Sequence, residues 1–274
     1  MNETTKRLIA IFTFALLLRV VALDASPFYR DEALYAEVID EMLGGGGIAP
    51  HYWGLVVSWK PPITFWFYSA FIALLSPAGL PTEFLYRLPS AILGAICSVL
   101  VYLIVKEARE GDDLALVSSV AYAGSALALF VNRMLLVDSL LLLFTLSSIL
   151  FYLKANGRAK LLFFGGLLAG LAVFTKTIAG LFAPVVAIVY FAFYERKTLF
   201  NSNFLISLIG VPLAFIVLFS LIPGMSTQFL VDSTQRTTGS DIGRTFAINL
   251  IVFLSLTLPW SGLAIYGAWR YWGT

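Results

Sequence analysis

The chain has 274 residues, of which 59% are hydrophobic and only 12% are charged, and its mean hydropathy is +0.89. This composition excludes a soluble domain, because apolar stretches recur at about the 20-residue length that crosses a bilayer. The formal net charge of +2 is small and no basic run is interleaved with aromatic residues, so nucleic acid is not expected as a partner. We therefore predict an all-α, multi-pass membrane protein.

The amino-terminal apolar run at residues 8–23 follows the basic residues Lys6 and Arg7, an order that a signal peptide would also have. Signal peptides have apolar runs of about 7–15 residues. The run here is longer and contains Arg19, so we interpret it as an uncleaved first helix.

Nine apolar segments can be distinguished along the chain. They lie at residues 8–23, 62–76, 88–105, 114–131, 139–153, 161–174, 178–194, 203–222 and 246–268. Lys and Arg in short loops favour the cytoplasm. If 62–76 crosses the membrane, ten basic residues lie outside and seven inside; if it does not, ten lie inside and seven outside. The second topology obeys the rule and predicts about eight spans, a cytoplasmic N-terminus and one long extracytoplasmic loop at 24–87.

Two helices are expected within this loop. Residues 62–76 follow a double proline and are dense in aromatic side chains, which suits the headgroup level of a membrane. Residues 31–43 have the pattern of a short amphipathic helix, which the glycines at 44–47 should end.

The predicted topology gathers charged residues on the extracytoplasmic side. They are Arg30, Asp31, Glu32, Lys60, Arg87, Arg133, Asp138, Lys176, Arg236 and Arg244. Lys176 also divides residues 161–194 into halves of about 21 to 26 Å as helices, short of the ~30 Å core, so its turn should dip into the membrane. Polar groups at that depth are tolerated where they line protein or a wet cavity. We expect an outward-facing cavity that contains carboxylates and cations.

The carboxylates and cations of this expected cavity suit a reaction on an anionic, amphiphilic substrate. Lys and Arg would hold a phosphate, a carboxylate would deprotonate an incoming hydroxyl or amine, and the aromatic helix and short spans would admit a lipid tail. A lipid-phosphate sugar donor has all of these features.

Several motifs in order resemble those of GT-C glycosyltransferases, most closely the aminoarabinose transferase and protein O-mannosyltransferase-like group. They are RDEALYAE at 30–37, WKPPITFW at 59–66, RLPS at 87–90, RMLLVD at 133–138, TKTIAGL at 175–181 and LPWS at 258–261. The resemblance covers nearly the whole chain and implies a GT-C-like helical bundle that uses polyprenyl-phosphate sugars. It makes residues 1–274 a single transmembrane domain, to which such proteins usually add a C-terminal extracytoplasmic domain.

The resemblance also implies catalytic roles. Asp31 matches the first-loop acid that activates the acceptor, and Glu32 its acidic neighbour. Asp138 matches a second acid, which helps to build the site or, with Asp31, to hold a divalent metal where one is used.

Because Cys97 and His51 are the only residues of their types, no disulfide within the chain and no Cys/His metal cluster can form.

The remaining assignments concern the donor phosphate. Lys60 matches a lysine that contacts it, and Arg236, within TQRTTG at 234–239, resembles an arginine of a later loop. Lys176 and Arg133 are further candidates. Two departures from the family pattern are a threonine after Lys176, where glycine and proline are common, and a 223–245 loop without histidine.

Each candidate also has a structural interpretation. Asp31 and Glu32 suit the N-terminus of a helix by charge, and Lys60 could extend to the interface beside a tryptophan. Arg133 and Asp138 could form an ion pair with each other.

Other charges have similar interpretations. Lys176 could be the buried partner of one of the acids. We interpret Arg87 and Glu83 as loop charges, and Arg19 as either reaching the interface or pairing within the bundle.

The function that combines these features is transfer of a sugar from a polyprenyl-phosphate donor to a lipid, glycan or protein acceptor, by inverting displacement at the extracytoplasmic face of the cell membrane. The alternatives are a transporter or flippase for an anionic amphiphile and a purely structural membrane subunit. Apart from a metal, the resemblance implies no cofactor, and the expected partners are the donor, the acceptor and membrane lipids.

Overall fold

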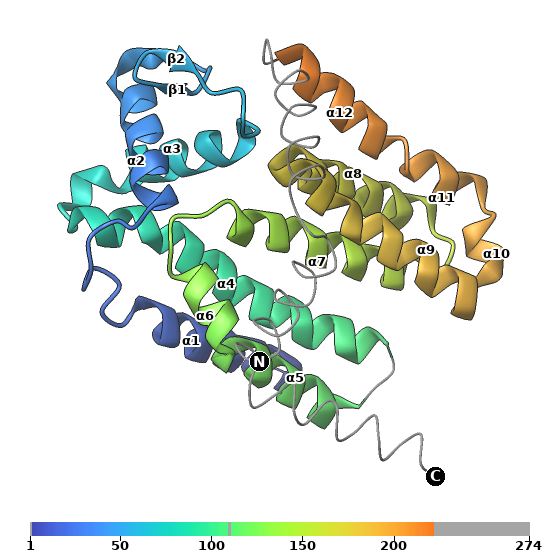
Figure 1. Cartoon of the computed structure of the whole chain (residues 1–274). Coiled ribbons are helices and arrows are strands. Elements are labelled where there is room, and N and C mark those ends of the chain that lie inside the picture. The colour runs from blue at the N-terminus through green and yellow to red at the C-terminus, as the bar shows by residue number, and fades with distance from the viewer. Residues whose placement is uncertain (1, 109–110, 222–274) are drawn as a thin grey trace, which may run out of the picture.

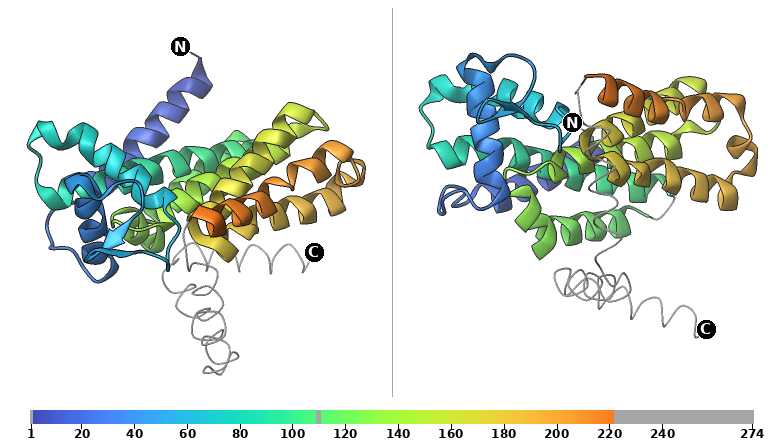
Figure 2. Two further views of the ribbon diagram at one scale, coloured as in Figure 1. Left: turned by 90° about the horizontal axis from the view of Figure 1, so that it is seen from above. Right: turned by 45° about the horizontal axis from the view of Figure 1, so that its top comes forward.

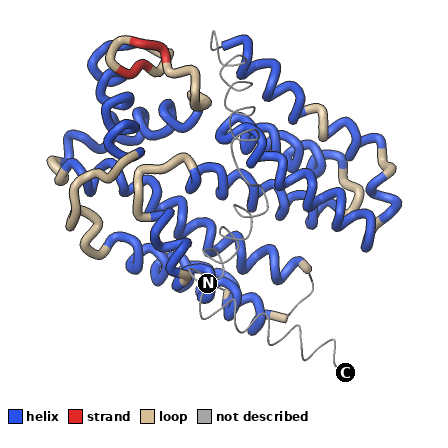
Figure 3. The backbone as a smooth tube through the Cα atoms, in the orientation of Figure 1, coloured by secondary structure: helices blue, strands red, loops and turns tan. Residues whose placement is uncertain are grey.

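The computed structural model describes residues 2–108 and 111–221, and the statements below concern this part of the chain (Figure 1). Most of it is helical (Figure 3). The only strands among the described residues are β1 (His51–Tyr52) and β2 (Leu55–Val56), which pair antiparallel with His51 opposite Val56. The all-α expectation is confirmed.

The first part of the bundle packs α1 along a long α4. These helices and their neighbours are α1 (Glu3–Val20), α4 (Thr82–Glu107), α5 (Asp112–Gly124) and α6 (Ala126–Asn132). The first helix begins before its apolar run because the side chain of Asn2 accepts a hydrogen bond from the Thr5 amide at 2.8 Å, which caps the helix. The segment expected as one span at 114–131 is instead bent by 59° between α5 and α6.

Residues 24–81, the α2–α3 subdomain, form a small unit at one end of the bundle (Figure 2). Its elements are α2 (Asp31–Glu41), the π-helical turn η1 (Met42–Gly46), the β-hairpin, α3 (Ile63–Leu75) and the 3-10 turn η2 (Ser76–Ala78). The glycines end the helical path as expected, since Gly45 and Gly47 have φ of +105° and +83°. At 13 residues, α3 is about 20 Å long and too short to span the core.

The second part of the bundle consists of shorter helices. They are α7 (Asp138–Ala155), α8 (Ala159–Lys176), the 3-10 turn η3 (Thr177–Leu181), α9 (Phe182–Tyr194), α10 (Arg196–Leu199), α11 (Ser202–Ser207) and α12 (Gly210–Leu221). The chain reverses after α8: a Cβ on Gly180 would lie 2.2 Å from the Val173 amide nitrogen, which a continuous helix could not produce. Glycine at 170 allows α8 to approach α12 closely, because a Cβ there would lie 2.6 Å from the Gly210 carbonyl oxygen.

Length and composition qualify three helical stretches of the described residues as membrane spans, or four with the bent α5–α6 pair. One of the three, residues 159–194, contains the reversal at η3, so it consists of two arms. The segment 203–222 is divided between α11 and α12, and 246–268 lies outside the described residues. The count of eight spans therefore stays a prediction. The interpretation of Glu83 and Arg87 as loop charges is wrong, because α4 begins at Thr82 and includes both.

Arg19 lies at the centre of the first part of the bundle and is fully buried. Its guanidinium donates to the carbonyl oxygens of Ala15 at 2.9 Å and Ala123 at 3.4 Å. The bend after α5 leaves the Ala123 carbonyl without a helical partner, which explains why a cation is accommodated there. Gly94 of α4 makes the space, because a Cβ on it would lie 2.5 Å from both Arg19 Nε and Asn132 Cβ. Arg19 thus pairs within the bundle.

Candidate functional site

Four elements bring the main candidate residues to the end of the bundle that carries the α2–α3 subdomain (Figures 1 and 2). Asp31 begins α2, Lys60 lies just before α3, Asp138 begins α7 and Lys176 ends α8. A shared core joins the first three elements, and it contains Tyr35, Phe65, Leu135 and Val137. The fourth joins through the rings of Trp66 and Phe174, whose centroids are 6.1 Å apart.

Asp31 is exposed at the first turn of α2. The residue before it, Arg30, has φ of +48°, a conformation that side chains other than glycine rarely adopt and that is often found at functional sites. On the other side of the site, Thr177 has φ of +42° directly after Lys176. The backbone is thus strained beside two of the candidate residues.

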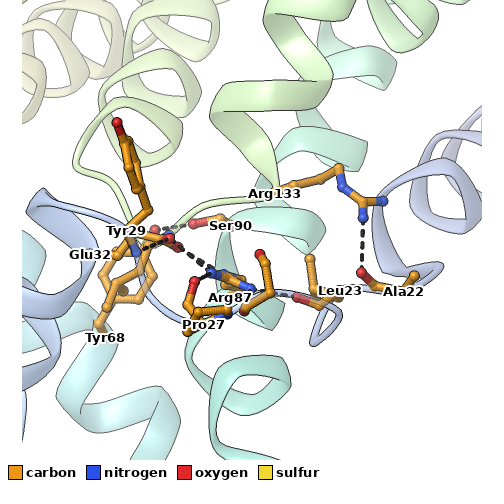
Figure 4. Close-up of polar contacts among 11 residues, drawn as sticks. Ala22, Leu23, Pro27, Tyr29, Glu32, Tyr68, Arg87, Ser90 and Arg133 are labelled. Atoms are coloured by element: carbon orange, nitrogen blue, oxygen red, sulfur yellow. Dashed lines mark hydrogen bonds and ion pairs between the residues drawn. The ribbon is translucent and has the colours of Figure 1, made fainter.

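Glu32, in contrast, is fully buried and forms an ion pair with Arg87 of α4, which is 4% exposed. Arg87 donates from Nε to Oε1 at 2.8 Å and from Nη2 to Oε2 at 2.9 Å, a bidentate arrangement (Figure 4). Removing one partner of such a pair would cost about 3–5 kcal/mol, because it leaves an uncompensated buried charge.

The rest of the hydrogen-bonding capacity of this pair is also used. Each carboxylate oxygen of Glu32 also accepts a hydrogen bond from a backbone amide: Oε1 from Leu135 at 2.9 Å and Oε2 from Tyr29 at 3.1 Å. Arg87 donates its other hydrogens to three carbonyl oxygens of the segment before α2, those of Leu23, Ser26 and Pro27. Glu32 is thus buried and fully bonded, whereas Asp31 next to it is exposed, so the two neighbouring acids have different surroundings.

Asp138 and Lys176 form a second ion pair, with Oδ1 and Nζ 2.6 Å apart and both side chains about one-third exposed. Lys176 is therefore the partner of an acid, as one interpretation expected, but the pair is partly exposed and not buried. The alternative pair of Arg133 with Asp138 is wrong. Arg133 instead donates to the carbonyl oxygens of Leu18, Arg19 and Ala22, where it caps the C-terminal end of α1 (Figure 4).

Tyr35 is a further candidate residue, which the sequence motifs did not single out. Burial raises the pKa of Tyr35 well above the ordinary value, and the negative charges of Asp31 and Asp138 raise it further. Its ring stacks on Trp59 with centroids 6.4 Å apart, directly beside Lys60. The i, i+4 spacing from Asp31 on α2 was a signal that could have found it.

A cavity of about 680 Å³ opens beside Asp138, between α5, α6, α7 and α9. Its lining is mostly apolar, with polar side chains that include Tyr122, Asn132 and Asp138. The cavity thus combines an acid at one point with an apolar wall, as a site for an amphiphile requires.

Two predicted features remain to be placed. Lys60 is half-buried, and Arg236 lies outside the described residues. Within residues 2–108 and 111–221, no group of three His, Cys, Asp or Glu side chains could hold a metal ion. Asp138 is in addition neutralised by Lys176, so the described residues do not fit a metal.

Comparison with solved structures supports the fold. An ArnT from Cupriavidus metallidurans, crystallised with undecaprenyl phosphate, superposes with a TM-score of 0.73 and 21% identity, covering 98% of this chain and 52% of that one. The same protein without ligand gives a TM-score of 0.67 over 84% of this chain. The chain therefore has the fold of the corresponding half of a polytopic GT-C protein.

Sequence comparison finds relatives named undecaprenyl phosphate-alpha-4-amino-4-deoxy-L-arabinose arabinosyl transferase. The protein from Erwinia tasmaniensis is 28% identical over 88% of this chain and 46% of its own length, and that from Aeromonas hydrophila is 27% identical over 93% and 49%. The chain spans about half the length of these relatives. The model of the family described as dolichyl-phosphate-mannose-protein mannosyltransferase matches residues 59–223, more than half of the chain. The chain belongs to this family.

Proposed function

We propose that the protein transfers a sugar from a polyprenyl-phosphate donor to an acceptor at the extracytoplasmic face of the membrane. The observation that carries this proposal is that an exposed carboxylate, Asp31 at the start of α2, and an acid–lysine pair, Asp138 of α7 and Lys176 of α8, lie at the end of the bundle that carries the α2–α3 subdomain. Such a site offers a base on one side and a cation on the other. The names of the relatives agree with a polyprenyl-phosphate donor.

The proposed reaction is a single displacement. Asp31 accepts the proton of the acceptor hydroxyl or amine, whose oxygen or nitrogen attacks the anomeric carbon. The bond from that carbon to the phosphate oxygen breaks, and the polyprenyl phosphate leaves with the electron pair. Attack opposite the leaving group inverts the anomeric configuration.

The cations act on the leaving group. Lys60 and Lys176 hold the donor phosphate and stabilise the charge that it gains as the sugar departs, and Arg236 is a further candidate for this role. Asp138 keeps Lys176 in place before the donor binds. The apolar cavity beside Asp138 provides room for a hydrocarbon part of a substrate.

The proposal is tested with purified protein, a panel of polyprenyl-phosphate sugars and extracytoplasmic acceptors, by following release of the lipid phosphate and formation of the glycosylated acceptor. The wild-type protein should form both products in equal amounts. Translocation of the donor without sugar transfer would support a transporter instead.

The orientation gives a separate prediction. In a Cys97→Ala background, a cysteine at Glu83 should react with a membrane-impermeant reagent from outside intact cells, and one at Ala108 only after the cytoplasm is opened. The two positions lie at opposite ends of α4, whose 26 residues extend about 39 Å. Cytoplasmic labelling of position 83 would contradict the proposed side of the site.

A further inference from the structure

We propose that the buried Glu32–Arg87 pair is a positioning unit that fixes Asp31 relative to Asp138, and that neither member touches a substrate. This inference rests on the proposed function. Glu32 directly follows Asp31, and its carboxylate accepts the amide of Leu135, three residues before Asp138. One carboxylate therefore joins the two chain segments that carry the exposed acids.

The Glu32–Arg87 pair, called the node below, connects otherwise separate elements. Arg87 lies on α4 and holds the segment before α2 through the carbonyl oxygens of Leu23, Ser26 and Pro27. The same arginine donates two hydrogen bonds to Glu32 at the start of α2. The entry to α2, and with it Asp31, is thus fixed to the side of α4.

The loop between α6 and α7, residues 133–137, is the other segment fixed by the node. The Leu135 amide donates a hydrogen bond to Glu32. The next residue, Leu136, accepts a hydrogen bond at its carbonyl oxygen from the Tyr68 hydroxyl at 3.1 Å. Tyr68 is itself buried, and its hydroxyl lies 2.6 Å from Ser90 Oγ on α4 (Figure 4). The start of α7 is therefore tied to α2, α3 and α4 immediately before Asp138.

A displacement needs its base and its phosphate-binding groups at a fixed separation. A misplacement of about 1 Å can cost about 10²-fold in rate, even when its origin is remote from the reacting atoms. The node sets this separation, because it joins the segments that carry the base and the acid–lysine pair. Its loss should lower turnover more than donor binding.

The first variant is Glu32→Gln, which keeps the shape but replaces one acceptor oxygen by an amide donor that faces N–H groups. We expect kcat to fall by about 10- to 100-fold while KM for the donor stays within about threefold. Arg87→Lys, which keeps the positive charge but loses the bidentate contact with the Glu32 carboxylate, should have the same effect. Wild-type kcat in both variants would overturn the proposal.

Loss of stability alone must be distinguished from positioning. Phe191→Ala opens a cavity in the far core of α7, α9 and α11, where Phe191 packs with Tyr152 and Phe204. This control should retain its kcat at a similar loss of melting temperature. Adding Glu32→Gln to Asp31→Asn should lower kcat by no more than about twofold, because the base is already absent. An equal loss of kcat in the control, or a full multiplicative loss in the double variant, would overturn the inference.

A measurement without turnover separates this inference from the proposed function. Nitroxide labels at Ala33 and Phe130, both exposed, report the distance from α2 to the end of α6 in a Cys97→Ala background. The distance distribution should broaden in Glu32→Gln and in Arg87→Lys but not in Phe191→Ala. Unchanged distributions in the first two variants would overturn the positioning role, whether or not the wild type transfers a sugar.

Discussion

Replacing Asp31 by asparagine should reduce turnover by about 10²–10⁴-fold while leaving donor binding nearly intact. The amide keeps the shape of the carboxylate but cannot accept the proton of the acceptor. Because the side chain of Asp31 is exposed, the melting temperature should change little.

The measurement is the rate of lipid phosphate release, together with donor affinity from binding in the absence of acceptor. Asp24→Asn is the matched control, since Asp24 is an equally exposed aspartate in the segment before α2. Wild-type turnover by Asp31→Asn would exclude Asp31 as the base. A loss of donor affinity as large as the loss of turnover would instead give it a role in binding.

Replacing Lys60 by alanine should lower kcat by about 10²–10³-fold and also weaken donor binding. The lysine is expected to interact with the phosphate both before and during departure of the sugar, and the interaction strengthens as the phosphate gains charge. Both parameters therefore change, in contrast to the loss of a base.

Kinetics over a range of donor concentrations separate the two effects. Lys154→Ala is a suitable control, because Lys154 is half-buried like Lys60 but lies near the end of α7 opposite to Asp138. An unchanged kcat with a raised KM would mean that Lys60 contributes only to uniform binding. An effect of equal size in the control would point to a general effect of removing a lysine.

The sequence predicted the helical class and most helix positions because apolar length and glycine content act locally. Residues 139–153 and 161–174 correspond to α7 and α8 with shifts of at most two residues. The bend at Ser125 could not be predicted in this way, because the Ala123 carbonyl beside it is bonded to Arg19, more than a hundred positions away. The hydrophobicity of a segment does not indicate a hydrogen-bond partner that is distant in the sequence.

The candidate site could be assembled from the sequence in part. The motifs singled out Asp31, Asp138 and Lys176, and the ion pair between the last two was one of the alternatives that the sequence left open. Arg87 was misinterpreted because it stands before the first apolar residue of its segment, and only the partnership with Glu32 explains its burial. Arg133 was expected near the phosphate, whereas the exposed carbonyls at the end of α1 attract it.

The missing side chain of Gly94 has an evolutionary consequence. A Cβ at position 94 would meet both Arg19 and Asn132 at 2.5 Å, and both are held in place, because the arginine is fully buried and the asparagine is bonded to Ser139 at 3.0 Å. The three positions should therefore change together among relatives. A lineage that gains even an alanine at position 94 must first have exchanged Arg19 or Asn132 for a smaller residue, so the order of these substitutions is constrained.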